Sequence, residues 1–68
     1  MTEYDVYYEP GLGCFITWEE GDHYMAQDYP DQKPYYWDPK SSSTKIYRGT
    51  YGSKESAFAW IEKYDFEH

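Results

Sequence analysis

Residues 44–64 read TKIYRGTYGSKESAFAWIEKY, and they contain one strand signal followed by one helix signal. Residues 44–51 are rich in β-branched and aromatic side chains, as strands are. Gly52 and Ser53 then end the strand and offer a helix N-cap. Beyond them an apolar stripe recurs at i, i+3, i+4 and i+7, made by Ala57, Trp60, Ile61 and Tyr64 with Phe58 flanking. The stretch therefore predicts a strand at 44–51 and a helix at 53–65 whose stripe faces a sheet.

The amino-terminal residues predict that sheet. Residues 3–9 alternate, with Tyr4, Val6 and Tyr8 on one face, which is typical of a half-buried strand. The turn residues 10–13, PGLG, lead into a second strand at 14–20. A tight turn at 20–22 leads into a third strand at 23–28. We expect these strands to form a three-stranded meander.

Residues 29–43 contain three prolines and a run of serines, which exclude a regular helix and a central strand. We expect a long loop that carries three rings in a row, at Tyr35, Tyr36 and Trp37. Loops of this length are usually functional or mobile. These rings either cover the core or face a partner.

The patterns together predict an α+β fold, a small antiparallel sheet of three to four strands with one C-terminal helix packed on it. A chain of 68 residues is expected to form one domain. Aromatic residues make up 24% of the chain, which argues against disorder. Its predicted parts are an acidic sheet at 3–28, the loop at 29–43, the strand at 44–51 and the helix at 53–65.

The charge is segregated along the chain. Residues 1–34 hold one base, Lys33, against eight acids: Glu3, Asp5, Glu9, Glu19, Glu20, Asp22, Asp28 and Asp31. Residues 35–68 contain equal numbers of acids and bases, so the first half carries the whole formal charge of −7. Such asymmetry indicates a positively charged partner.

Residues that could carry chemistry are few. Cys14 is the one cysteine and lies between apolar neighbours, which suits a buried residue in a reducing compartment. His23 and His68 are isolated, and no metal-ligand spacing or nucleotide-binding loop is present. We therefore expect no enzymatic activity, no catalytic residue, no metal and no cofactor. No apolar run approaches the roughly 20 residues of a membrane span, so we expect a cytoplasmic protein without a membrane partner.

The acids form the one constellation with a mechanism. Alternate residues of a strand lie about 6.5–7 Å apart, so Glu3, Asp5 and Glu9 would form a row of carboxylates on one face. This spacing is about twice the ~3.4 Å rise per strand of duplex DNA. The expected partner-binding residues are Glu3, Asp5, Tyr7, Glu9, Glu19, Glu20, Asp22, Asp28, Asp31, Tyr35, Tyr36 and Trp37, with Trp18 as a further aromatic anchor. The alternative is that each acid only keeps the protein soluble.

Two resemblances add to these interpretations. Residues 46–60, IYRGTYGSKESAFAW, resemble the last strand and helix start of AP2-type and integrase amino-terminal DNA-binding domains. This resemblance implies a small DNA-binding or recombination accessory domain, with contacts made by Lys40, Lys45, Arg48 and Lys54. The short, acidic, aromatic-rich composition resembles phage-encoded anti-CRISPR and anti-restriction inhibitors, several families of which are DNA mimics.

Our leading hypothesis is a non-enzymatic inhibitor of the anti-CRISPR type, a DNA mimic in the cytoplasm of a phage-infected bacterium. Its partner would be a basic nucleic-acid-binding protein, a CRISPR effector subunit or similar nuclease, with no direct binding of nucleic acid. We expect the chain to act as a monomer. The alternatives are the AP2-like domain, a carbohydrate-binding module that stacks a sugar on Tyr35, Tyr36 and Trp37, and an adaptor without special chemistry.

Overall fold

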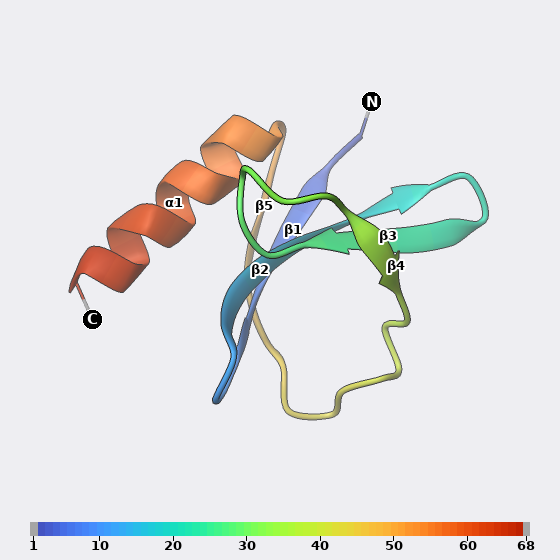
Figure 1. Ribbon diagram of the computed structural model, residues 1–68, viewed down its shortest axis with the longest axis horizontal. Helices are drawn as coiled ribbons and strands as arrows, with labels where there is room; N and C mark the ends of the chain where they lie inside the picture. The colour runs from blue at the N-terminus through green and yellow to red at the C-terminus, as the bar shows by residue number, and fades with distance from the viewer. Residues whose placement is uncertain (1, 68) are drawn as a thin grey trace.

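The computed structural model describes residues 2–67, and side chains up to residue 64, so His68 lies outside the described residues. One antiparallel sheet of five strands, in the order β4-β3-β2-β1-β5, carries one helix on one of its faces (Figure 1). The elements are β1 (Tyr4–Glu9), β2 (Gly13–Glu20), β3 (His23–Gln27), β4 (Tyr35–Trp37), β5 (Ile46–Tyr51) and α1 (Lys54–Glu67). The predicted α+β class is confirmed.

The meander of the first three strands forms as the alternation predicts. Val6 lies opposite Ile16 in the β1–β2 pair, and Trp18 lies opposite Met25 in the β2–β3 pair. The turn between β2 and β3 contains Gly21 at φ 66°, a left-handed conformation that glycine adopts without a steric cost. These registers place the apolar residues of neighbouring strands on the same face.

The expectation of one long loop at 29–43 is wrong at residues 35–37, although the exclusion of a helix and of a central strand is confirmed. Residues 35–37 form β4, which pairs with β3 through Tyr36 opposite Met25. The sheet therefore has five strands rather than three to four. Pro34 and Pro39 limit β4 to three residues at the edge of the sheet, which is where flanking prolines are tolerated.

The last strand pairs with the free edge of β1. Tyr4 lies opposite Tyr51, and a bulge shifts the register between Val6 and Tyr7. Gly49 adopts φ 127°, and a Cβ there would lie 3.3 Å from the Tyr51 hydroxyl oxygen.

The bounds of the last two elements differ from those predicted. The strand β5 starts at residue 46 rather than at 44, and the helix α1 runs from 54 to 67 rather than from 53 to 65.

The main core lies between the sheet and α1. It consists of Val6, Ile16, Trp18, Ala57, Phe58 and Ile61, all buried. The predicted stripe is confirmed, although Phe58 is buried within it and Trp60 is only half-buried. Ser53 caps the helix, because its Oγ accepts a hydrogen bond from the backbone N–H of Ser56 at 3.1 Å.

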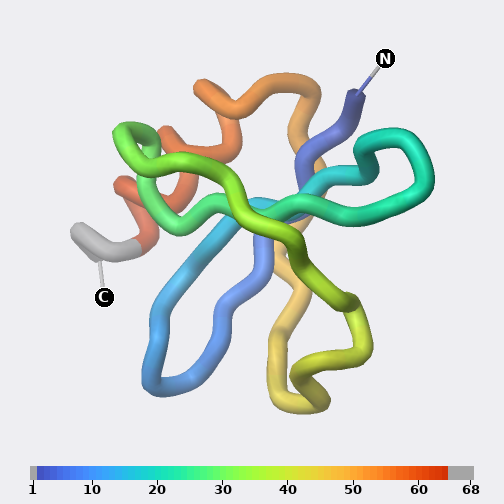
Figure 2. Tube along the Cα trace, turned by 45° about the vertical axis from the view of Figure 1, so that its right-hand side comes forward, coloured from blue at the N-terminus to red at the C-terminus, as the bar shows by residue number. Residues whose placement is uncertain are grey.

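The face of the sheet away from α1, called the open face below, has a smaller core of its own. Thr17 and Ala26 are buried there, and Phe15 is 8% exposed. The sheet curls so that the Trp37 ring of β4 lies 5.7 Å from the Tyr7 ring of β1. Residues 38–45, called the bridging segment, connect the two edge strands β4 and β5 (Figure 2).

Replacing Ile16 tests this account of the main core. Because Ile16 is fully buried, Ile16→Ala should lower the free energy of unfolding by about 2–5 kcal/mol in urea titrations. Leu12→Ala is the matched control, because Leu12 is 83% exposed and its loss should change stability by less than about 0.5 kcal/mol. Equal effects of the two substitutions would contradict the assignment of the core.

Candidate functional site on the open face

Part of the predicted carboxylate row is presented to solvent. The residues around a hollow of about 380 Å³ at the start of β1 are Thr2, Glu3, Asp5, Glu19 and Tyr24. Glu3 and Glu19 are exposed, whereas Asp5 is half-buried and accepts a hydrogen bond from the Thr50 hydroxyl at 2.6 Å. We call Glu3, Asp5 and Glu19 the acidic patch.

The tip of the β2–β3 hairpin continues this negative charge. Glu20 and Asp22 are exposed there, and the tip lies beside the amino-terminal end of the chain (Figure 2). Asp22 contacts the Nδ1 atom of His23 at 3.2 Å, and this hydrogen bond lowers the pKa of the Asp22 carboxyl. Five predicted acids therefore gather at one end of the sheet.

The exposed carboxylates at this end of the sheet have no Lys or Arg partner among the described side chains. Among the side chains of residues 2–64, no Lys or Arg forms an ion pair with a carboxylate. The Lys54 ammonium instead lies 4.3 Å from the centroid of a Trp18 ring and donates to Gln27 Oε1. The Arg48 guanidinium lies 5.5 Å from the centroid of the Tyr64 ring.

Glu9 belongs to the same face but has a different role. Its side chain is 9% exposed, and its two carboxylate oxygens accept hydrogen bonds from the Ser42 and Thr44 hydroxyls. These hydrogen bonds, first from Ser42 and then from Thr44, lower the pKa of Glu9, and the nearby charge of Lys45 adds to the effect. Glu9 therefore ties β1 to the bridging segment, and its burial separates it from the exposed acids of the patch.

Lys45 holds the bridging segment from the other side. Its ammonium donates hydrogen bonds to the carbonyls of Pro39 at 2.6 Å and Ser42 at 2.8 Å. It also lies 5.9 Å from the centroid of Tyr7 and 5.8 Å from that of Trp37, within the range of a cation–π interaction. Burial, and then the charge of Asp5, raises the pKa of Tyr7 beneath it.

The predicted aromatic anchors are divided between two faces. Tyr35 and Trp37 share the open face, whereas Tyr36 points to the other side, where its ring lies 4.9 Å from His23. Trp37 is half-buried over the small core, and Trp18 is a core residue at 6% exposure. Tyr35, Tyr36 and Trp37 therefore do not form one stacking platform for a sugar.

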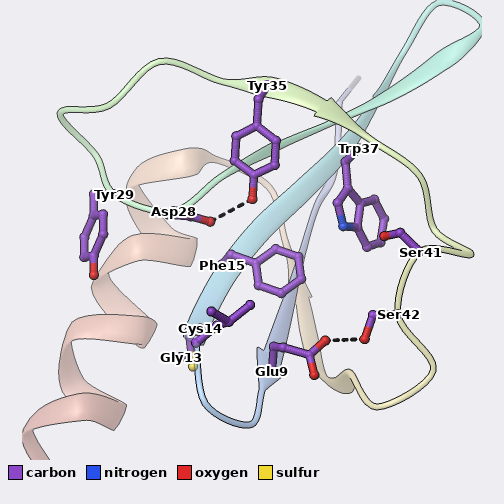
Figure 3. Close-up of a pocket in the computed structure, with 11 residues that line it drawn as sticks. Glu9, Gly13, Cys14, Phe15, Asp28, Tyr29, Tyr35, Trp37, Ser41 and Ser42 are labelled. Carbon is purple, nitrogen blue, oxygen red and sulfur yellow. Dashed lines mark hydrogen bonds between the residues drawn. The ribbon is translucent and has the colours of Figure 1, made fainter.

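A second hollow, the aromatic cavity, lies on the open face between β2, β4 and the bridging segment (Figure 3). Its volume is about 340 Å³. The polar and aromatic residues that line it are Glu9, Phe15, Asp28, Tyr29, Tyr35, Trp37, Ser41 and Ser42. The Tyr35 hydroxyl donates to Asp28 Oδ1 at 2.9 Å. Burial, and then this hydrogen bond, raises the pKa of Tyr35 to about 12.

Sequence reasoning missed Phe15 and Tyr29 as lining residues. Phe15 had a signal, because it alternates with the core residues of β2 and so belongs to the open face. Tyr29 had none, because its place depends on how the chain leaves β3. Asp31 is exposed in the turn after β3 and does not line the cavity.

The bases expected for DNA binding do not gather in one place. Lys45 lies against the open face, whereas Arg48 and Lys54 contact Tyr64 and Trp18 on the side of α1. Lys40 is exposed in the bridging segment. In the part of the chain that the structure describes, no three His, Cys, Asp or Glu side chains are placed to hold a metal ion.

Comparisons with protein-family models, with curated proteins and with solved structures found no match. Within the described residues, no helix is long and apolar enough to cross a membrane.

The tie made by Glu9 predicts a particular dependence of stability on pH. Because folding lowers the pKa of Glu9, its contribution is present above the unfolded pKa, near 4.5, and is lost as the pH falls through the lower folded value. Glu9→Gln should therefore destabilise the protein at pH 7, and the difference from the native chain should shrink towards pH 3. Thermal unfolding at both pH values measures this difference.

The control for this experiment is Glu3→Gln, which removes one charge from an exposed side chain that no described group binds. It should have little effect on stability at either pH. A Glu9→Gln penalty that stays constant from pH 7 to pH 3 would show that the ionised carboxylate is not what holds the bridging segment.

Proposed function

We propose that this chain is a non-enzymatic inhibitor of the anti-CRISPR type, which binds a basic nucleic-acid-binding protein and blocks its access to DNA. The partner would be a CRISPR effector subunit or a similar nuclease. The observation that supports this proposal is the gathering of Glu3, Asp5, Glu19, Glu20 and Asp22 at one end of the sheet, without a Lys or Arg partner among the described side chains.

The arrangement of the acidic patch suits a surface that normally binds phosphates. Asp5 belongs to β1 and Glu3 directly precedes this strand, so an extended backbone separates them by about 6.5–7 Å, and Glu19 belongs to the neighbouring strand, about 4.8 Å away. Like charges on adjacent strands repel each other and cost stability. A partner that brings Lys and Arg side chains to this patch would relieve the repulsion.

Charge and aromatic surface have separate roles in this proposal. Exposed carboxylates speed the encounter with a basic surface, and this effect weakens as salt screens the charges. Tyr24 lines the same hollow and is 40% exposed, so it offers a ring beside the carboxylates. Tyrosine is one of the residues that most often dominate binding energy at protein interfaces.

Charge reversal on the acidic patch tests the proposal. Glu3→Lys combined with Glu19→Lys should weaken binding to the partner by at least about tenfold, because two attractive contacts become repulsive. The matched control is Asp31→Lys combined with Glu62→Lys, which changes the net charge equally at exposed sites outside the patch. The partner is first recovered by pulldown at low salt, identified and purified, and its affinities for both variants are then measured.

Two results would contradict the proposal. One is an equal loss of affinity in the two double variants, which would mean that only the overall charge matters. The other is failure of duplex DNA to compete with the chain for the purified partner. Direct binding of duplex DNA by the chain itself would instead favour the AP2-like alternative.

A further inference from the structure

The aromatic cavity has a chemical character that the acidic patch lacks. The rings of Phe15, Tyr29, Tyr35 and Trp37 surround it, and the carboxylates of Glu9 and Asp28 belong to its lining. No Lys, Arg or His is among the described residues that line it. The cavity therefore combines π-electron faces with negative charge, the two features that attract organic cations.

The walls of this cavity are held in place before any ligand arrives. Phe15 stacks on Tyr7 at 6.0 Å and meets the edge of Trp37 at 5.8 Å. Tyr35 points from β4 towards Asp28 and is fixed there by its hydrogen bond (Figure 3). Because these rings already have partners, a ligand loses little affinity to ordering them.

One cation of this chain already lies close to the rings on this face, the Lys45 ammonium. The Lys45 ammonium lies 5.8 Å from the Trp37 centroid, and its hydrogen bonds go to the carbonyls of Pro39 and Ser42. Its charge compensates Glu9, whose pKa it helps to lower. Among the described side chains, no Lys or Arg forms an ion pair with Asp28, and the hydrogen bond that the structure shows to its carboxylate is made to Oδ1 by Tyr35. The side of the cavity at Asp28 is therefore where negative charge would attract a further cation.

We infer that the aromatic cavity binds the guanidinium group of an arginine side chain carried by a protein partner. A guanidinium is planar, so it can stack on an aromatic ring while it donates hydrogen bonds to the Asp28 carboxylate. A quaternary ammonium has no N–H to donate, so it could not form a hydrogen bond to that carboxylate. A lysine ammonium has donors but no flat face to lie against the rings.

The choice of a protein as the source of the arginine rests on the proposed function, because nucleic-acid-binding surfaces use arginine to contact phosphates. The preference of the cavity for a guanidinium group does not rest on it. The two ideas can therefore be tested apart, the second with a small arginine derivative and no partner at all.

The test uses the full chain and Nα-acetyl-arginine methylamide, followed through the NMR signal of the Trp37 indole N–H. We expect a dissociation constant on the order of 1 mM, which corresponds to about −4 kcal/mol. The matching citrulline derivative has nearly the same shape but no charge, and it should bind at least tenfold more weakly. Asp28→Asn should weaken arginine binding at least fivefold.

Asp28→Asn is a mild change, because the amide oxygen can still accept the hydrogen bond from Tyr35. Its matched control is Asp31→Asn, which removes the same charge three residues away, outside the cavity, and should change the affinity less than twofold. Equal binding of the arginine and citrulline derivatives, or equal effects of the two substitutions, would overturn the inference. Either result would leave partner binding by the acidic patch as a separate question.

Discussion

The sheet of this chain has two faces to cover, and one helix is available to cover them. The helix α1 buries Val6, Ile16 and Trp18 on its own side. On the other side the chain covers itself, because the sheet curls until Trp37 of β4 reaches Tyr7 and Phe15. The bridging segment then joins the two edges of the sheet, and Glu9 and Lys45 hold it through hydrogen bonds. At the amino-terminal end of β1, neither Trp37 nor the bridging segment covers the open face. This end is therefore exposed to solvent and carries the acidic patch.

This division explains why acids of one strand differ in role. Glu3, Asp5 and Glu9 have the same parity along the chain, so they belong to one face. Only Glu9 lies under the bridging segment, where two hydroxyls satisfy its carboxylate and burial is tolerated. Glu3 lies at the uncovered end and is exposed. Strand alternation thus assigns a residue to one face of the sheet. The course of a distant segment then determines whether that residue is buried and supports the fold or is exposed to solvent.

The same distinction separates what the sequence could predict from what it could not. The helix and the first three strands have strong local periodicity and glycine turns, and their predicted types are confirmed. The strand β4 has only three residues between prolines, so its local signal is that of a loop, and pairing with β3 is what makes it a strand. The cavity depends on contacts across the fold, such as that of Tyr35 with Asp28, and local patterns do not encode them. The acidic patch was predictable in part, because strand parity and charge place Glu3 and Asp5 on one face, whereas the burial of Glu9 depends on the bridging segment.

The two features of the open face act over different distances, which is why they complement each other. The electrostatic potential of the acidic patch extends over about 8–10 Å at moderate ionic strength, so in the proposed function it would orient a basic partner before contact. The rings around the aromatic cavity act only within contact distance, where, in the inference above, stacking and a hydrogen bond to Asp28 would discriminate between a flat cation and a point charge. A surface with charge alone would bind any basic protein, and one with rings alone would find its partner slowly. The acidic patch and the aromatic cavity lie at opposite ends of β1, and in the proposed function a chain of 68 residues would combine fast encounter with selection.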